Sequence, residues 1–321
     1  MAIPVFLFVV GLALLIKGGD WFVDGATGIA HHFRIPELLI GATVVSIGTT
    51  LPEVMVSATS ALGGHGEIAY GNALGSIICN TSLIAALTIA IRPSKTERSS
   101  LVSPVIFFFA AATVYTITAY TTGHFGRITG LILLIIFIVY MVYTVMQMKH
   151  GPSGNDTPKD DGPEPSMGKN VVLLIIGAVL IAIGANLLVD NGTLIAQSLG
   201  VPESVIALTF VALGTSLPEL VTAVTSLAKG HGALSLGNVI GANLFNLVLV
   251  SGVSTTLAPF DIPRNASVAG INASLAVDIP LMLFVMLFLT LPALIRGKLS
   301  RIQGIVLLLI YGAYCIFQFT L

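Results

Sequence analysis

Charged residues are scarce in this sequence. Only 9% of its 321 residues are charged, whereas 55% are hydrophobic, and the mean hydropathy is +0.98. A soluble globular domain carries about 25% charged residues, so the composition excludes that class and predicts an integral membrane protein. The net charge of −1 points to no partner. We expect the lipid bilayer as surroundings, no nucleic-acid partner and no cofactor, and the oligomeric state stays open.

Three further absences narrow the class. The two cysteines, Cys79 and Cys315, both lie in apolar runs and offer neither a disulfide framework nor a zinc spacing. Alternating ten-residue strands are absent, which favours helices over an outer-membrane barrel. The N-terminus has no basic segment and no clear cleavage site, so we predict that its apolar run is a transmembrane helix and not a signal peptide.

Long apolar runs predict an all-α integral membrane protein with ten transmembrane helices. The only clear linker is 149–168, which is rich in Pro, Gly, Asp and Lys. The ten spans are expected near 3–30, 37–62, 67–91, 101–121, 127–148, 170–199, 203–228, 233–258, 274–295 and 301–320.

Lys and Arg are distributed unequally between the two sets of connections, and this predicts the orientation in the membrane. One set holds only Arg127 and Arg264. Because the basic side is normally cytoplasmic, we expect both termini to be extracytoplasmic and the linker 149–168 to be cytoplasmic, in a multi-pass protein of the cell membrane. The basic set holds Arg34, Arg92, Lys95, Arg98, Lys149, Lys159, Lys169, Lys229, Arg296, Lys298 and Arg301.

The second half of the chain repeats the first. When residue 36 is aligned with residue 202, 19 of the 45 positions in 36–80 are identical to their counterparts in 202–246, without a gap. Each half holds five expected spans, and an odd number places the second half upside down relative to the first. We therefore predict two inverted five-helix repeats, 1–148 and 169–321, joined by the linker 149–168. Secondary transporters typically have this architecture, with the binding site near the midplane between the repeats.

The repeat carries a polar phrase within apolar surroundings. It reads Gly-Thr-Thr-Leu-Pro-Glu at 48–53 and Gly-Thr-Ser-Leu-Pro-Glu at 214–219. Polar residues recur every three or four positions along these spans and along the next span of each half, so each set forms one helical stripe. The stripes hold Ser46, Thr50, Glu53, Ser57 and Ser60; Thr209, Ala212, Thr215, Ser216, Glu219, Thr222 and Thr225; Asn72, Ser76 and Asn80; and Asn238, Ala242 and Asn246.

The chemistry of the phrase favours a hard cation. Pro52 and Pro218 lack an N–H, so we expect bent or broken helices with freed carbonyls. Carbonyl, hydroxyl and carboxylate oxygens suit Na⁺ or Ca²⁺ better than Zn²⁺. An acid at the centre of a membrane helix costs about 2.5–3.5 kcal/mol, and a bound cation offsets that cost for Glu53 and Glu219. These two glutamates are therefore the strongest candidates for function.

Other ionisable residues also recur in register. Asp24 and Asp190 fall late in the two long helices and are expected to be helix-end packing or gating groups. His65 and His231 lie in short Gly-flanked connections, where a role in the turn is expected rather than ion binding.

The paired phrases, each followed by Gly-Asn, resemble the repeats of the calcium/cation antiporter superfamily, in its sodium/calcium exchanger branch. The resemblance implies exchange of Ca²⁺ for about three Na⁺ by alternating access. It also implies that the long first and sixth helices slide across the other eight. The motifs cover about half of the chain.

Carried over by position, the resemblance implies a ligand set for Ca²⁺ and Na⁺. Glu53 and Glu219 would be the central acidic ligands. Thr49 and Thr215 would supply oxygens to Ca²⁺, with Thr50 and Ser216 in support. The remaining members would be the carbonyls of Ser46 and Ala212, together with Ser76, Asn80 and Asn246.

Two departures from the family pattern keep other functions open. Ala242 stands where sodium/calcium exchangers have Ser, and Asn246 stands where they commonly have Asp, so the coupling to Na⁺ is open. Another cation antiporter, such as a Ca²⁺/H⁺ exchanger, is the first alternative. The second is an intramembrane enzyme that uses the paired acids, which the absence of an Asp pair and of a His-Glu-x-x-His motif disfavours. A passive channel is a further alternative.

Overall fold

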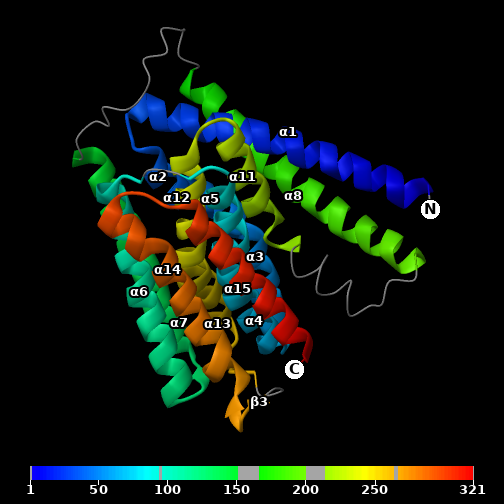
Figure 1. The fold of residues 1–321 in the computed structure, drawn as a ribbon, viewed down its shortest axis with the longest axis vertical. Coiled ribbons are helices and arrows are strands. Elements are labelled where there is room, and N and C mark those ends of the chain that lie inside the picture. Colours follow the sequence, from blue (N-terminus) through cyan, green and yellow to red (C-terminus); the bar gives the residue numbers. More distant parts are fainter. Residues whose placement is uncertain (1, 94–95, 151–165, 200–213, 264–266, 321) are drawn as a thin grey trace.

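The computed structural model describes residues 2–93, 96–150, 166–199, 214–263 and 267–320, and these form an almost entirely helical bundle (Figure 1). Helices that span a bilayer satisfy all their backbone hydrogen bonds internally, as an apolar environment demands. The elements of the first half are α1 (Ala2–Phe33), α2 (Glu37–Ile40), η1 (Gly41–Val45), α3 (Ser46–Leu62), α4 (Gly66–Cys79), η2 (Asn80–Ala85), α5 (Ala86–Ile91), α6 (Arg98–Thr121), β1 (His124–Phe125) and α7 (Arg127–His150).

The second half follows the same pattern. Two short antiparallel strand pairs, β1 with β2 and β3 with β4, accompany its helices. The elements are α8 (Met167–Ser198), α11 (Leu217–Ala228), α12 (Gly232–Phe245), η4 (Asn246–Ser251), α13 (Gly252–Leu257), β2 (Phe260–Asp261), β3 (Ser267–Val268), β4 (Ile271–Asn272), η5 (Ser274–Asp278), α14 (Ile279–Arg296) and α15 (Arg301–Thr320).

Nine stretches of helix among the described residues are long and apolar enough to cross a membrane. They correspond to nine of the ten expected spans, so the chain is an all-α, multi-pass membrane protein. The remaining expected span, 203–228, lies partly outside the described residues, and its described part contains the shorter apolar helix α11. The count of ten spans therefore stays a prediction.

Burial separates the central helices from the peripheral ones. In the most apolar window of Gly232–Leu257, 89% of the residues are buried, compared with 17% for Arg301–Gln318. The stretch Gly66–Ile91 comes next, with 72%. The two spans that follow the repeated phrases therefore form the centre of the bundle.

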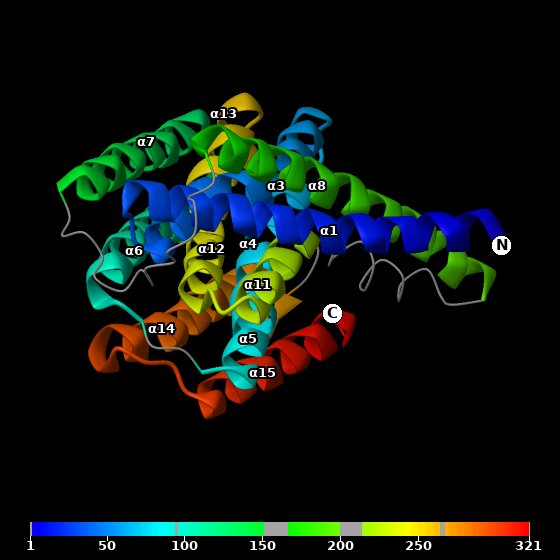
Figure 2. The same ribbon diagram turned by 90° about the horizontal axis from the view of Figure 1, so that it is seen from above.

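The helices α1 and α8 form a separate pair that lies across the bundle (Figures 1 and 2). Glycines allow their backbones to touch. A Cβ added at Gly11 would lie 2.9 Å from the carbonyl oxygen of Gly184, and one added at Gly177 would lie 2.5 Å from the amide nitrogen of Phe22. Small residues at such a contact are typical of membrane helices, whose association depends on close packing.

The sequence repeat is visible in the described elements. The order α4, η2, α5 recurs as α12, η4, α13, and every boundary falls at the aligned position of the other half. The turns before α4 and α12 also match, because Gly64 (φ 84°) and Gly230 (φ 89°) both adopt the left-handed conformation that favours glycine. His65 and His231 follow them as the N-cap residues of α4 and α12, in the turns where the sequence placed them.

Candidate functional site

The two repeated phrases lie on neighbouring elements, the first on α3 and the second at the start of α11. Glu53 is on α3 and Glu219 is in the first turn of α11, and neither side chain is exposed at all. Their carboxylates are close enough to interact electrostatically. The structure thus brings together two acids that are far apart in the chain, one from each half.

The two prolines have different effects on their helices. In the first phrase α3 continues through Pro52, so of the bent or broken helix that was expected there, the structure excludes the break. In the second, Thr215 and Ser216 form a turn, and α11 begins at Leu217 with Pro218 in its first turn. A proline at that place costs no intrahelical hydrogen bond, because the first N–H groups of a helix have no partner within it.

The carboxyl groups are surrounded by oxygen atoms. Thr49 and Thr50 lie on α3, one turn before Glu53, and α3 packs against α11, which carries Glu219. All four carboxyl oxygens of Glu53 and Glu219 are buried and find no hydrogen-bond donor among the residues that the structure describes. The hydroxyls of Thr50 and Ser216 are likewise buried without a described partner. Buried polar atoms are nearly always paired, so this cluster has the chemistry of a cation cage.

Asn80 and Asn246 begin matching π-helical turns, η2 and η4. Both are fully buried, and both have a side-chain oxygen without a described hydrogen-bond partner. Helix α11 packs against η2, so this turn adjoins the second phrase. Ser76 is buried one helical turn earlier on α4. Single π-turns often occur at functional sites, and the sequence pattern did not predict them.

Ser46 is buried at the start of α3, where its hydroxyl donates to the carbonyl oxygen of Gly41 at 2.7 Å and to that of Asn238 at 3.0 Å. Its counterpart Ala212 lies outside the described residues, as does Thr209. The structure therefore does not place one predicted member of the site. Ala242 is fully buried on α12 and brings no hydroxyl.

Two further residues belong to the site by contact. The hydroxyl of Thr49 donates to Oδ1 of Asn238 at 3.2 Å, and the hydroxyl of Thr215 donates to Oδ1 of Asn72 at 3.2 Å. Asn72 and Asn238 lie on the predicted polar stripes but were not among the candidate ligands. The repeated Gly-Asn pair was the available signal.

A small cavity adjoins the phrases on the side of α1 and α8. Its walls include Thr49, Pro52 and Pro218 from the phrases, Phe22 from α1 and Ile181 from α8. A Cβ added at Gly48 would come within 3.1 Å of the Phe22 ring, so the glycine of the first phrase makes room for that ring. The paired helices α1 and α8 therefore cover the site on this side.

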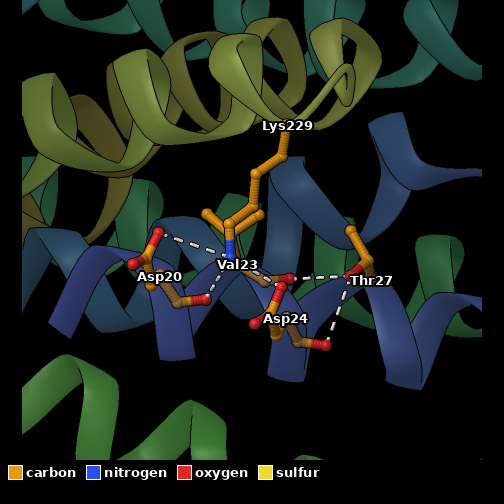
Figure 3. Close-up of polar contacts among 5 residues, drawn as sticks. All are labelled: Asp20, Val23, Asp24, Thr27 and Lys229. Carbon is orange, nitrogen blue, oxygen red and sulfur yellow. Dashed lines mark hydrogen bonds and ion pairs between the residues drawn. The ribbon is translucent and has the colours of Figure 1, made fainter. Parts of the chain in front are cut away.

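Away from the site, Lys229 links α11 to α1 (Figure 3). Its Nζ lies 2.7 Å from Oδ1 of Asp24, 3.4 Å from Oδ1 of Asp20 and 3.0 Å from the carbonyl oxygen of Asp20. The aligned position of the first half is Gly63, so that half has no corresponding lysine. Asp24 thus makes an ion pair between helices, whereas its counterpart Asp190 is an exposed residue of α8.

An all-helical membrane bundle with two buried acids on repeated phrases belongs to the class of secondary ion transporters. The profile of the sodium/calcium exchanger protein family matches residues 3–146 and 169–320. The chain belongs to this family of cation antiporters, and it is a transporter and not an enzyme.

Individual relatives match over nearly the whole chain. The uncharacterized membrane protein MJ0091 of Methanocaldococcus jannaschii is 36% identical over 95% of this chain and 94% of its own length. The sodium/calcium exchanger MaX1 of Methanosarcina acetivorans is 29% identical over 98% and 97%. A solved structure of the sodium-calcium exchanger NCX_Mj superimposes with a TM-score of 0.78 at 35% identity, covering 97% of each chain.

Proposed function

We propose that this protein is a sodium/calcium antiporter of the cell membrane, which moves Ca²⁺ against Na⁺ by alternating access. Membership of the exchanger family supports cation antiport, and the names of MaX1 and NCX_Mj support these two ions. The observation that carries the proposal is the buried pair Glu53 and Glu219, whose four carboxyl oxygens lack described donors. Two carboxylates match the charge of one Ca²⁺ and can alternatively hold Na⁺ ions.

The proposed ligands are the oxygens around that pair. Glu53 and Glu219 are shared by Ca²⁺ and Na⁺, and Thr49 and Thr215 supply further oxygens to Ca²⁺. Flanking Na⁺ ions use the carbonyls of Ser46 and Ala212 and the side chain of Ser76. Thr50, Ser216, Asn80 and Asn246 complete the set. Apart from Thr215, which is half-buried, the described members are buried, and this burial supports the set. The orphaned oxygens of Thr50, Ser216, Asn80 and Asn246 support it as well.

The proposed architecture is two inverted five-helix repeats, 1–148 and 169–321, around the cytoplasmic linker 149–168. Ten spans place both termini outside the cytoplasm, in agreement with the distribution of Lys and Arg. The recurrence of α4, η2 and α5 as α12, η4 and α13 supports the repeat. The site then lies between the repeats, where both can open it to opposite sides of the membrane.

Alternating access is proposed to involve sliding of α1 and α8 as one unit. Their glycine contacts hold the two helices together, and their residues Phe22 and Ile181 line the cavity beside the phrases. Movement of this pair across the bundle changes the cover of the site without disturbing the central helices. This arrangement supports a cycle in which one site is exposed alternately to each side.

The test is Ca²⁺ uptake into vesicles that contain the purified protein. With Na⁺ inside and none outside, we expect Ca²⁺ uptake that collapses when the Na⁺ gradient is abolished. In the same vesicles a proton gradient without Na⁺ is expected to drive no uptake. Uptake driven by protons and not by Na⁺ would instead establish Ca²⁺/H⁺ exchange, the alternative raised by Ala242 and Asn246.

A further inference from the structure

Two asparagines outside the predicted ligand set connect the halves of the site crosswise. Thr49 of the first phrase donates to Asn238 on α12, and Thr215 of the second phrase donates to Asn72 on α4, each at 3.2 Å. The two threonines occupy aligned positions of the repeat, and so do the two asparagines. The same bond is therefore made twice, and each copy joins one half of the chain to the other.

The amide of Asn72 is held in one orientation. Its Nδ2 donates to the carbonyl oxygen of Glu53 at 3.3 Å and to the hydroxyl of Ser57 at 2.8 Å. A carbonyl oxygen can only accept, so this end of the amide must be the NH₂ group. The amide oxygen consequently faces Thr215 and is available to accept its proton.

Asn238 is fully buried and is held at its backbone, where its carbonyl oxygen accepts from the hydroxyl of Ser46 at 3.0 Å. Its Oδ1 lies 3.2 Å from the hydroxyl of Thr49 and is the nearer of two acceptors, since the carbonyl oxygen of Ser46 lies 3.4 Å from the same hydroxyl. Ala223 occupies the position aligned with Ser57, so the second half lacks the serine that anchors the first amide. The Nδ2 of Asn238 accordingly finds no partner among the described residues.

These bonds determine what the threonine hydroxyls can offer a cation. A hydroxyl has one proton and two lone pairs, and it can coordinate a cation only if the proton points elsewhere. Donation to an amide oxygen removes the proton from the cation's side and leaves both lone pairs free. We infer that Asn72 and Asn238 are positioning residues that orient the hydroxyls of Thr215 and Thr49 as ligands for Ca²⁺. The inference rests on the proposed function, because it takes these threonines as ligands.

The crosswise arrangement has a second consequence. Each threonine is oriented by an asparagine of the opposite half of the chain. Both hydroxyls are therefore oriented for cation binding only when the two halves are packed against each other as they are in this structure. The ligand set is thereby linked to the packing of α3 on α12 and of the second phrase on α4.

A double-mutant cycle tests this role by equilibrium binding of radioactive Ca²⁺ to the purified protein. We expect Asn238→Leu to weaken binding by about tenfold, since the nearer acceptor of the Thr49 hydroxyl is lost and only the more distant carbonyl oxygen of Ser46 remains to hold its proton. Thr49→Val removes the hydroxyl itself. In the Thr49→Val background, Asn238→Leu is expected to change the affinity by about twofold at most, because nothing remains for it to orient. Independent effects that multiply in the double variant would overturn the inference.

Asn243→Leu is the matched control. Asn243 is also fully buried on α12, but its Nδ2 donates to Thr81 at 2.7 Å and to the sulfur of Met286 at 3.1 Å, away from both phrases. We expect this variant to lower thermal stability and to leave Ca²⁺ affinity unchanged. An equal loss of affinity in the control would show that any buried amide of α12 has the same effect, and would overturn the inference.

If Asn238→Leu does not fold, the corresponding cycle of Asn72→Leu and Thr215→Val tests the inference. Unfolding of both asparagine variants would contradict the inference, because it would mark the amides as structural. A wild-type protein that binds no Ca²⁺ would contradict the proposed function and this inference with it. A wild type that binds Ca²⁺, together with multiplying effects in the cycle, would contradict the inference alone.

Discussion

From the contact between Lys229 and α1 we predict how a substitution of Lys229 changes the transport rate. If α1 and α8 slide across the bundle, the bonds from Lys229 to Asp20 and Asp24 must break in each cycle (Figure 3). The side chain of Lys229 is 27% exposed, whereas those of Asp20 and Asp24 are 40% and 51% exposed, so solvent screens the pair. Such an ion pair contributes about 1 kcal/mol at most.

A barrier lowered by that amount raises a rate by a factor of about five at most. We therefore expect Lys229→Gln to raise the maximal velocity of Na⁺-driven Ca²⁺ uptake by up to about this factor at low ionic strength. The difference should shrink at high ionic strength, because salt screens exposed charges. The exchanged pair Lys229→Asp with Asp24→Lys should return the velocity towards that of the wild type.

Lys17→Gln is the matched control for this experiment. Lys17 also lies on α1, but its Nζ lies 5.4 Å from the centre of the Trp21 ring on the same helix, so the contact does not link α1 to α11. We expect its removal to leave the velocity unchanged. The reasoning is refuted if Lys229→Gln behaves like this control, or if its effect persists undiminished at high salt.

Three other substitutions test packing and the ligand set. Gly177→Ala should lower the free energy of unfolding by about 1–3 kcal/mol, because the added Cβ meets the backbone of Phe22, and thermal unfolding in detergent measures this. Gly168→Ala is its control, since no heavy atom lies within 4 Å of a Cβ there, and an equal loss would contradict the close contact. Ala242→Ser should change the Na⁺ affinity or its cooperativity in uptake assays with little effect on Ca²⁺ affinity; an unaltered Na⁺ dependence would exclude position 242 as a ligand. Tyr140→Phe should cost about 1 kcal/mol of stability, because the hydroxyl donates to the carbonyl oxygen of Ala42 at 2.9 Å, and unchanged thermal unfolding would rule out that contribution.

Hydrophobicity and the repeat allowed much of the architecture to be predicted from the sequence. Nine expected spans coincide with membrane-length helices among the described residues. The polar stripes, whose residues are three or four positions apart, fall on helices in the structure, with their described members on α3, α4, α11 and α12 or directly beside them. Glu53 and Glu219 were singled out for a physical reason, since buried acids in membrane helices are costly unless they have a function.

What could not be predicted depends on how the helices pack against each other. A stripe identifies a face but not the residue opposite it, so the bonds from Thr49 to Asn238 and from Thr215 to Asn72 became visible only in the structure. The link from Lys229 to α1 could not be predicted either, because it depends on where α1 crosses α11. The two prolines also could not be told apart from the sequence, since α3 continues through Pro52 whereas α11 begins next to Pro218.

We propose that the two repeated phrases form one cation site and not two. Equilibrium binding of radioactive Ca²⁺ to purified wild type, Glu53→Gln and Glu219→Gln tests it most directly, with thermal unfolding to show that each variant is folded. We expect one Ca²⁺ bound per wild-type chain, displaced by Na⁺, and no binding at the same concentrations to either variant. Two Ca²⁺ per wild-type chain, with each variant retaining one, would contradict it.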